Sequence, residues 1–196
     1  LFNVLLTIQI KAKRSGNETI YKMVSKLSAL LRASIYTNNV DRITVGEELE
    51  YTEFYLYLQK MRFEDRFFYK IIVEDEELKK SIIPKFVIEP IVENAVIHGI
   101  ENIENEGVIR IVLKKMGTDL LVTVQDNGAG FDVKEYFNSL EQAENGSSRE
   151  KIGLKNVDLR LRHIYGEEYR IKIKSKINTG TTIYIKIPIE EREENV

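Results

Sequence analysis

Hydrophobic residues in the first third of the chain recur at the spacing of an α-helix. Residues 4–14 and 20–35 each carry apolar positions three to four residues apart, which predicts two amphipathic helices separated by a short polar break. A third helix is predicted from Thr44 to Phe63. Thr44 followed three positions later by Glu47 is the signature of a capping box, so the start of this helix is well marked.

Beyond residue 66 the pattern changes to short strands mixed with helices. Segments rich in aromatic and β-branched residues, several of them flanking glycine-containing turns, predict strands and hairpins. The predicted strands are residues 67–73, 108–113, 120–124, 169–175 and 181–189. Two helices are predicted, one over residues 86–98 with Gly99 at its C-terminal end and one over residues 154–165. Pro90 is expected to delay or bend the start of the first.

These patterns predict an α+β fold in two parts. An N-terminal helical segment, residues 1–66, precedes a domain of residues 67–190 in which helices cover one face of a mixed sheet. Residues 131–152 are polar and weakly periodic, which indicates a mobile loop with one short helix, and the acidic residues 191–196 are expected to be a disordered tail.

The two leading helices suggest a second copy of the chain as a partner. Two amphipathic helices cannot bury their apolar faces alone, and pairing with the same two helices of another chain would form a four-helix bundle. The alternative is that they pack on their own C-terminal domain. We expect a homodimer through the N-terminal helices.

Composition excludes several classes of function. The 196 residues contain 29 Lys and Arg against 31 Asp and Glu, a formal net charge of −2, so nothing favours a bulk nucleic-acid binder. The absence of cysteine excludes a disulfide framework, thiol catalysis and a Cys-ligated metal, and two histidines are too few for a His-rich metal site. No apolar run approaches the 18 or so residues that a membrane span needs.

Three short segments of the second part carry candidate chemistry. They are Glu93-Asn94-Ala95-Val96-Ile97-His98-Gly99, Asp126-Asn127-Gly128-Ala129-Gly130 and Gly153-Leu154-Lys155-Asn156. Each has an ordinary interpretation, since asparagine often caps a helix, Asp-x-Gly-x-Gly is often a simple turn, and glycine is common at a helix start. Their order and their places at the ends of predicted elements favour a nucleotide site.

Asp126 is the candidate for recognising the base. A carboxylate at the end of a strand can accept a hydrogen bond from the exocyclic amine of adenine, an interaction of about 1.5–3 kcal/mol, and it repels the carbonyl that guanine has there. Gly128 and Gly130 are expected to let the backbone approach the base and to act as a hinge for the following loop. Thr181 offers a hydroxyl nearby.

The phosphates and their metal are assigned to two other segments. The amide oxygen of Asn94 suits Mg²⁺ that is already held by phosphates. The helix that starts near Gly153 directs N–H groups and the positive end of its dipole toward an anion.

The sequence resembles the ATP-binding fold shared by gyrase, Hsp90, MutL and the histidine kinases. More narrowly, it resembles the catalytic region of LytS-type bacterial sensor histidine kinases. The matching segments are residues 1–3, 47–63, 83–99, 153–161 and 180–188, together with the Asp126 turn. The resemblance implies that ATP and Mg²⁺ bind here, with Asn94 on the metal. The ATP-binding residues that it implies are Asn94, His98, Asp126, Gly128, Gly130, Gly153, Leu154, Asn156 and Thr181.

The resemblance also implies a reaction and a protein partner. Such kinases transfer the γ-phosphoryl group of ATP to a histidine and then to an aspartate of a response regulator. Leu1-Phe2-Asn3 resembles the end of the family's phosphoacceptor motif, which places the acceptor histidine two residues before Leu1. Neither His98 nor His163 matches that motif, so this chain is expected to bind ATP without phosphorylating itself. In this family the sensor often consists of membrane-spanning helices, so we expect a cytoplasmic fragment of a membrane-bound parent.

Two departures from the family pattern bear on function. Lys151 stands where a glycine is usual and leaves open a nucleotide-gated dimerisation scaffold without kinase activity. The ATP hydrolases of the superfamily carry a general-base glutamate four residues before the asparagine, and here that position is Pro90, which cannot activate water. Glu89 and Glu93 are directed away from that position by the helix. A serine kinase of the anti-sigma type is a weaker alternative.

Overall fold

A computed structural model describes residues 2–36, 41–136 and 152–190 of the chain. It divides into two compact units, Leu1–Asp41 and Arg42–Val196. Each unit is described by itself below.

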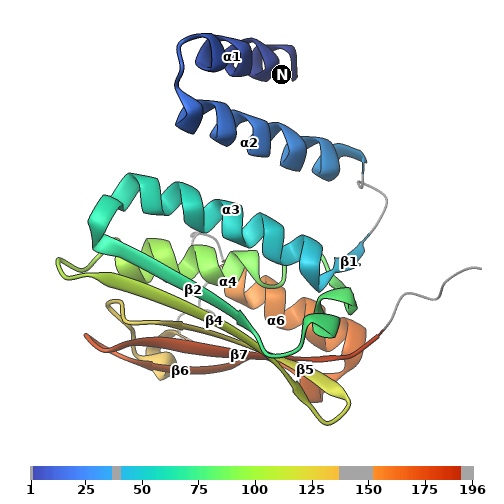
Figure 1. The fold of residues 1–196 in the computed structure, drawn as a ribbon. Helices are drawn as coiled ribbons and strands as arrows, with labels where there is room; N and C mark the ends of the chain where they lie inside the picture. The colour runs from blue at the N-terminus through green and yellow to red at the C-terminus, as the bar shows by residue number, and fades with distance from the viewer. Residues whose placement is uncertain (1, 37–40, 137–151, 191–196) are drawn as a thin grey trace, which may run out of the picture. The chain divides into compact units, whose positions relative to one another are not determined.

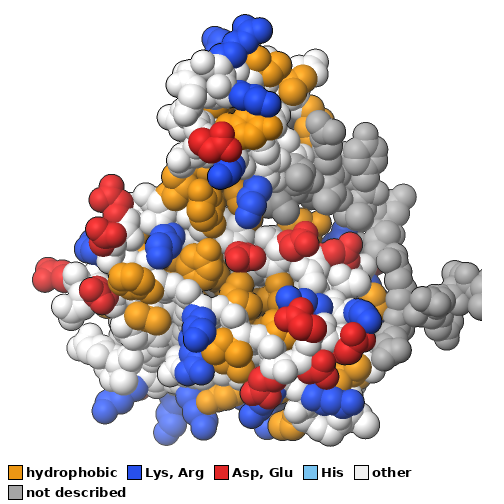
Figure 2. Space-filling model, in the orientation of Figure 1, with side chains coloured by type: hydrophobic (Ala, Val, Ile, Leu, Met, Phe, Trp, Pro, Cys, Tyr) orange, Lys and Arg blue, Asp and Glu red, His pale blue; other side chains and the backbone are white. Residues whose placement is uncertain are grey.

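The first unit is a pair of helices, α1 (Phe2–Arg14) and α2 (Glu18–Tyr36), joined by a tight turn. Asn17 caps α2, because its Oδ1 accepts a hydrogen bond from the backbone N–H of Ile20 at 3.0 Å. Among the side chains that the structure describes in this pair, the buried apolar ones are Leu5, Ala12 and Val24. Large hydrophobic side chains that stay exposed on α1 and α2 are Val4, Leu6, Ile8, Ile10, Ile20 and Leu27, and Figure 2 shows hydrophobic surface on this unit.

The second unit is built on a five-stranded mixed sheet (Figure 1). Its strands lie in the order β2-β4-β5-β7-β6, with β2 parallel to β4 and all other neighbours antiparallel. The strand bounds are Phe67–Val73 for β2, Gly107–Met116 for β4, Asp119–Asp126 for β5, Lys172–Lys176 for β6 and Gly180–Pro188 for β7. Alternate residues of β4, β5 and β7 are buried, as a sheet covered on one face requires.

Three helical segments cover that face of the sheet: α3 (Val45–Phe63), the run Glu89–Ile100 and α6 (Ile152–Tyr165). The run begins as the α-helix α4 (Glu89–Asn94) and continues as a π-helix over Ala95–Ile100. The core between the layers consists of fully buried aromatic and aliphatic side chains, among them Leu56, Phe67, Ile88, Ile111, Leu161 and Ile185. The expected α+β class, with a helical segment before a mixed sheet, is confirmed.

The compact units divide at residues 41 and 42, whereas the sequence pattern placed the change near residue 66. The reason is α3, which packs on the sheet and contributes Leu49 and Leu56 to the core of the second unit. A two-stranded antiparallel ladder of β1 (Arg42–Thr44) and β3 (Ile82–Pro84), which the sequence did not predict, also ties the entry of α3 to this unit.

The helix before the glycine turn begins late, as Pro90 led us to expect, and differs from expectation at its C-terminal end. It begins at Glu89, with Pro90 in its first turn, where a missing N–H costs nothing. It does not end at Gly99 but runs through it as π-helix to Ile100. Within the predicted loop 131–152, Asp132 caps a short helical turn. Its Oδ1 accepts hydrogen bonds from the backbone N–H groups of Lys134 and Glu135. Residues 137–151, with Lys151, and the tail 191–196 lie outside the described residues.

The capping box of α3 provides a test of the fold. The Thr44 hydroxyl accepts from the N–H of Glu47 at 3.1 Å, and the Glu47 carboxylate accepts from the N–H of Thr44 at 2.8 Å. Thr44→Ala removes the first of these bonds and should lower the free energy of unfolding by about 1 kcal/mol. Chemical denaturation measures the loss, and Thr44→Ser, which keeps the hydroxyl, should recover most of it. Equal stabilities of the Ala and Ser variants would contradict the cap.

Candidate functional site

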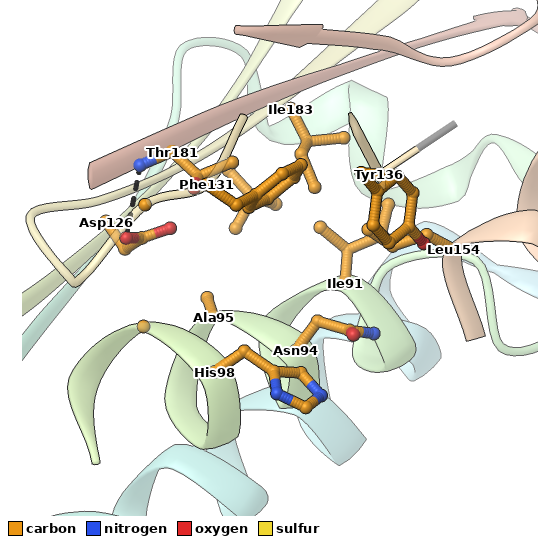
Figure 3. Close-up of a pocket in the computed structure, with 13 residues that line it drawn as sticks. Ile91, Asn94, Ala95, His98, Asp126, Phe131, Tyr136, Leu154, Thr181 and Ile183 are labelled. Atoms are coloured by element: carbon orange, nitrogen blue, oxygen red, sulfur yellow. Dashed lines mark hydrogen bonds between the residues drawn. The ribbon is translucent and has the colours of Figure 1, made fainter. Parts of the chain in front are cut away.

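A cavity of about 280 Å³ lies between the helical run 89–100 and the ends of β5 and β7 (Figure 3). The segment after the glycine turn and the start of α6 complete its wall. The side chains around it are mainly apolar, with a few polar groups among them, which is typical of a small-molecule site. Its lining residues are Ile91, Asn94, Ala95, His98, Gly99, Val124, Asp126, Gly130, Phe131, Tyr136, Leu154, Thr181 and Ile183.

Asp126 is the acidic group of this wall and lies at the end of β5. Its Oδ1 accepts hydrogen bonds from the N–H of Gly128 at 2.8 Å and from the N–H of Thr181 at 3.2 Å. Figure 3 shows the second oxygen directed toward the cavity. The side chain is only 6% exposed, and burial raises the pKa of Asp126, while the two backbone N–H groups act in the opposite direction. The backbone therefore orients the carboxylate and leaves one oxygen available to a ligand.

The glycines of the turn after β5 have distinct structural roles. Gly128 packs directly on the backbone of the helical run, since a Cβ there would lie 2.4 Å from the Cα of Gly99. Gly130 has a φ of +60°, and a Cβ there would meet the carbonyl oxygen of Lys176. Gly130 lines the cavity, whereas Gly128 does not. Gly128 thus acts through the close approach of two backbone segments.

Asn94 lies on the face of α4 that lines the cavity. Its Nδ2 donates to the carbonyl oxygen of Pro90 at 2.6 Å, which leaves Oδ1 as the acceptor end of the amide. Gly153 lies beside it, because a Cβ on Gly153 would be 3.0 Å from that Nδ2. His98 follows one turn later on the same helical run and also lines the cavity.

The remaining predicted residues divide between the cavity and its surroundings. Leu154 and Thr181 line the cavity. The hydroxyl of Thr181 lies 2.9 Å from the Ser175 Oγ, so it already has a partner within the protein. Gly153 is not in the lining although it touches Asn94, and Asn156 is exposed on α6 and outside the lining.

Sequence reasoning missed the apolar half of the lining. The missed residues are Ile91, Ala95, Gly99, Val124, Phe131, Tyr136 and Ile183. Ile91 and Ala95 recur with Asn94 at helical spacing, a signal that marks one helix face but does not separate a ligand cavity from a core. The rings of Phe131 and Tyr136, with centroids 5.1 Å apart, lie in the segment that was treated as a polar loop.

The carboxylates nearest to Asn94 in sequence do not reach the cavity. Neither Glu89 nor Glu93 is among its lining residues, and both charges, after burial, raise the pKa of Tyr55 on α3. Burial, followed by the charges of Glu48 and Glu93, raises the pKa of Glu89 to about 7. These carboxylates therefore lie on the α3 side of the helix.

The described residues contain neither a cluster of metal-binding side chains nor a membrane-spanning helix. Among these residues no three His, Asp or Glu side chains gather as a metal cluster, so a metal here would need ligands from a bound molecule as well. None of the helices that the structure describes is long and apolar enough to cross a bilayer.

The sequence matches two protein families. Residues 80–191 match the family described as histidine kinase-, DNA gyrase B-, and HSP90-like ATPases, and residues 1–67 match the family described as histidine kinases. The chain belongs to the histidine kinase-, gyrase B- and HSP90-like ATPase family. The match to the histidine kinase family ends at residue 67. It therefore includes α3, which the structure places in the second unit.

The curated relatives are sensor kinases. The chain is 35% identical over 188 residues to the sensor histidine kinase YesM of Bacillus subtilis (strain 168), a match that covers 96% of this chain and 31% of YesM. It is 32% identical over 189 residues to YpdA of Escherichia coli (strain K12), covering 96% of this chain and 32% of that protein. The chain is 30% identical over 194 residues to the sensor histidine kinase/phosphatase LytS of Staphylococcus aureus (strain MRSA252), a match that covers 98% of this chain and 33% of LytS. The chain thus spans about one third of these relatives.

Solved structures share the fold. The catalytic domain of histidine kinase ThkA gives a TM-score of 0.57 at 16% identity, covering 76% of this chain and 96% of that domain. The histidine kinase domain from the blue-light activated kinase of Erythrobacter litoralis EL346 gives a TM-score of 0.53 at 15% identity, covering 95% of this chain and 88% of that domain. The resemblance to a histidine kinase catalytic region is confirmed.

The raised pKa of Glu89 predicts how stability depends on pH. Between the ordinary glutamate pKa of 4.5 and about 7, the unfolded chain loses this proton while the folded chain keeps it, so Glu89 lowers stability as the pH rises through that window. Glu89→Gln stays neutral. The free energy of unfolding of this variant should equal that of the parent near pH 4.5 and exceed it by about 1–2 kcal/mol at pH 8. The expected gain is smaller than the full pKa shift would give, because the side chain is only half-buried.

Denaturant unfolding at the two pH values measures this difference. Glu50→Gln, which removes an exposed carboxylate of α3, is the control and should show no such dependence. A constant difference between Glu89→Gln and the parent across the pH range would contradict the assignment.

Proposed function

We propose that residues 42–190 bind Mg²⁺-ATP as the catalytic part of a sensor histidine kinase. In the whole protein the γ-phosphoryl group would pass to a histidine side chain and then to an aspartate of a response regulator. Family membership and the sensor kinase relatives support this proposal. The observation that carries it is Asp126, whose carboxylate is fixed at Oδ1 by two backbone N–H groups and directs its other oxygen into the cavity.

The cavity suits an adenine ring. Apolar residues from the helical run and the sheet, such as Ile91 and Ile183, offer surfaces for a flat aromatic ligand. The exposed oxygen of Asp126 can accept from the exocyclic amine of adenine, a charge-assisted bond of about 1.5–3 kcal/mol. Guanine presents a carbonyl oxygen at that position, so the same carboxylate would reject it.

Asn94 is the residue that would hold the magnesium ion. The hydrogen bond from its Nδ2 to Pro90 leaves Oδ1 as a neutral oxygen donor, which is the ligand type that Mg²⁺ accepts. Because the described residues offer no carboxylate cluster, the ion would depend on the phosphates of ATP for its other ligands. When bound, it would neutralise charge on those phosphates, while Asn94 and Asp126 hold the two ends of the nucleotide.

The chain's own residues favour phosphoryl transfer over hydrolysis. Pro90 occupies the position from which ATP hydrolases of this family activate water, and neither Glu89 nor Glu93 lines the cavity. Phosphoryl transfer to an imidazole needs positioning and charge neutralisation more than a general base. His98, the imidazole that lines the cavity, does not match the phosphoacceptor motif, so the acceptor would come from outside the cavity.

The exposed apolar side chains of α1 and α2 support dimerisation. Residues such as Val4, Ile8 and Ile20 remain exposed. Pairing with the same helices of a second chain would cover them in a four-helix bundle. We therefore propose that the kinase acts as a homodimer through this unit.

Asp126→Asn tests the adenine assignment. The Asn amide oxygen can still accept from the N–H groups of Gly128 and Thr181, so the fold should persist, but its NH₂ would face the amine of adenine. We expect at least about tenfold weaker ATP binding by calorimetry, equivalent to about 1.4 kcal/mol. Asp132→Asn, an exposed site outside the cavity lining, should bind as the parent does. Unchanged affinity in Asp126→Asn would exclude its role in reading the base.

Labelling tests the place of the acceptor. Incubated with γ-labelled ATP and Mg²⁺, residues 1–196 should gain no acid-labile phosphate, because neither His98 nor His163 matches the phosphoacceptor motif. A longer chain that includes the parent protein's residues before Leu1 should become labelled. Label on His98 or His163, or binding of ATP without label in the longer chain, would contradict the proposal.

A further inference from the structure

Glu48 is a fully buried carboxylate that lies outside the nucleotide cavity. It occupies the first turn of α3, where the sequence suggests only an acidic residue that favours the helix dipole. In the structure its side chain has 0% exposure and reaches across to the segment that leads into α4. A buried charge is costly unless it is hydrogen-bonded, so its partners need an explanation.

The partners are four consecutive backbone N–H groups. Oε1 accepts from Val87 at 2.9 Å, from Ile88 at 3.0 Å and from Glu89 at 3.3 Å. Oε2 accepts from Phe86 at 3.0 Å. Phe86 has a φ of +57°, which is unfavourable for a residue with a side chain, and the carboxylate stabilises this conformation.

These contacts supply the N-terminal cap that α4 lacks. Its N-cap residue is Ile88, whose side chain cannot accept a hydrogen bond, and Pro90 has no N–H to offer. The backbone N–H groups of Ile88 and Glu89 are the remaining donors at this helix start, and both donate to the Glu48 carboxylate. A negative charge at this end also complements the helix dipole.

The same helix carries the cavity lining. Ile91, Asn94, Ala95, His98 and Gly99 all follow within three turns of the capped start and all line the cavity. Because a helix is rigid over this length, a shift or rotation of its first turn displaces Asn94 and His98 together. The carboxylate thus controls where one wall of the cavity stands.

We propose that Glu48 is a positioning residue for the nucleotide site, since its carboxylate fixes the start of α4 and with it the place of Asn94. Glu48 acts from α3. The adjacent β1-β3 ladder holds the chain just before the residues that donate to this carboxylate. Residues 42–48 therefore hold residues 82–89 at two points. The inference rests on the proposed function in so far as the cavity binds Mg²⁺-ATP.

The test compares Glu48→Gln and Glu48→Asp in residues 1–196. Gln places an NH₂ against one of the N–H groups and removes the charge, while Asp keeps the charge but is one methylene too short. Both variants should shift the side-chain amide signal of Asn94 and the backbone signal of Gly99 in ¹H–¹⁵N spectra of the free protein. At a temperature where circular dichroism shows them folded, we expect Mg²⁺-ATP to bind at least about threefold more weakly.

Two controls separate positioning from stability. Glu50→Gln removes an exposed charge from the same helix, and Leu113→Val destabilises the core away from the cavity. Both should leave the Asn94 and Gly99 signals and the affinity as in the parent. Parent-like signals and affinity in folded Glu48 variants would overturn the proposal, as would an equal loss of affinity in Leu113→Val. If the parent itself fails to bind Mg²⁺-ATP, the proposed function falls, while the spectra still decide the role of Glu48.

Discussion

The cavity beside Asn94 and Asp126 depends on a contact between two backbone segments that have no side chains between them. Gly99 in the π-helical part of the run and Gly128 in the turn after β5 approach so closely that a Cβ on Gly128 would overlap the Gly99 backbone. The N–H of Ala129 donates to the carbonyl oxygen of Gly99 at 3.1 Å and closes the contact. A Cβ on Gly99 would lie 3.0 Å from the Asp126 Oδ1, so both glycines are needed to place the helix face next to the carboxylate.

The helical run that forms this wall is held at its two ends by different means. At its start the Glu48 carboxylate collects backbone N–H groups, and at its far end the glycine turn holds Gly99. Between them the backbone changes from α to π geometry, as the bond from the N–H of Glu101 to the carbonyl of Val96 shows. Fixed ends allow this less common geometry to persist, and π-turns often occur at functional sites.

Periodicity in the sequence predicted the elements but not every contact between them. β-Branched and aromatic residues beside glycine-containing turns identified strands such as β4 and β7, and the box at Thr44 and Glu47 marked the start of α3. The three-residue strands β1 and β3 are too short to show alternation, and an amphipathic pattern does not tell which surface α3 covers. Glu48 gave no signal, because a glutamate in the first turn of a helix is ordinarily a solvated charge. Phe131 and Tyr136 were missed because they lie in a segment whose polar composition predicted a loop, whereas Ile91 and Ala95 were missed because apolar residues that line a ligand cavity look like core residues.

In the proposed kinase, Pro90 connects the cap of α4 to the choice between water and an imidazole as the phosphoryl acceptor. As a residue without an N–H it suits the first turn of the helix, where it leaves fewer donors for Glu48 to satisfy. As a residue without a carboxylate it removes the base that would activate water one turn before Asn94. The neighbouring Glu89 and Glu93 cannot substitute, since neither lines the cavity and both charges act on Tyr55 at the α3 side of the helix. A nucleotide bound beside Asn94 would therefore keep its γ-phosphoryl group until an acceptor arrives from outside the cavity, which is what a kinase with a separate histidine segment requires.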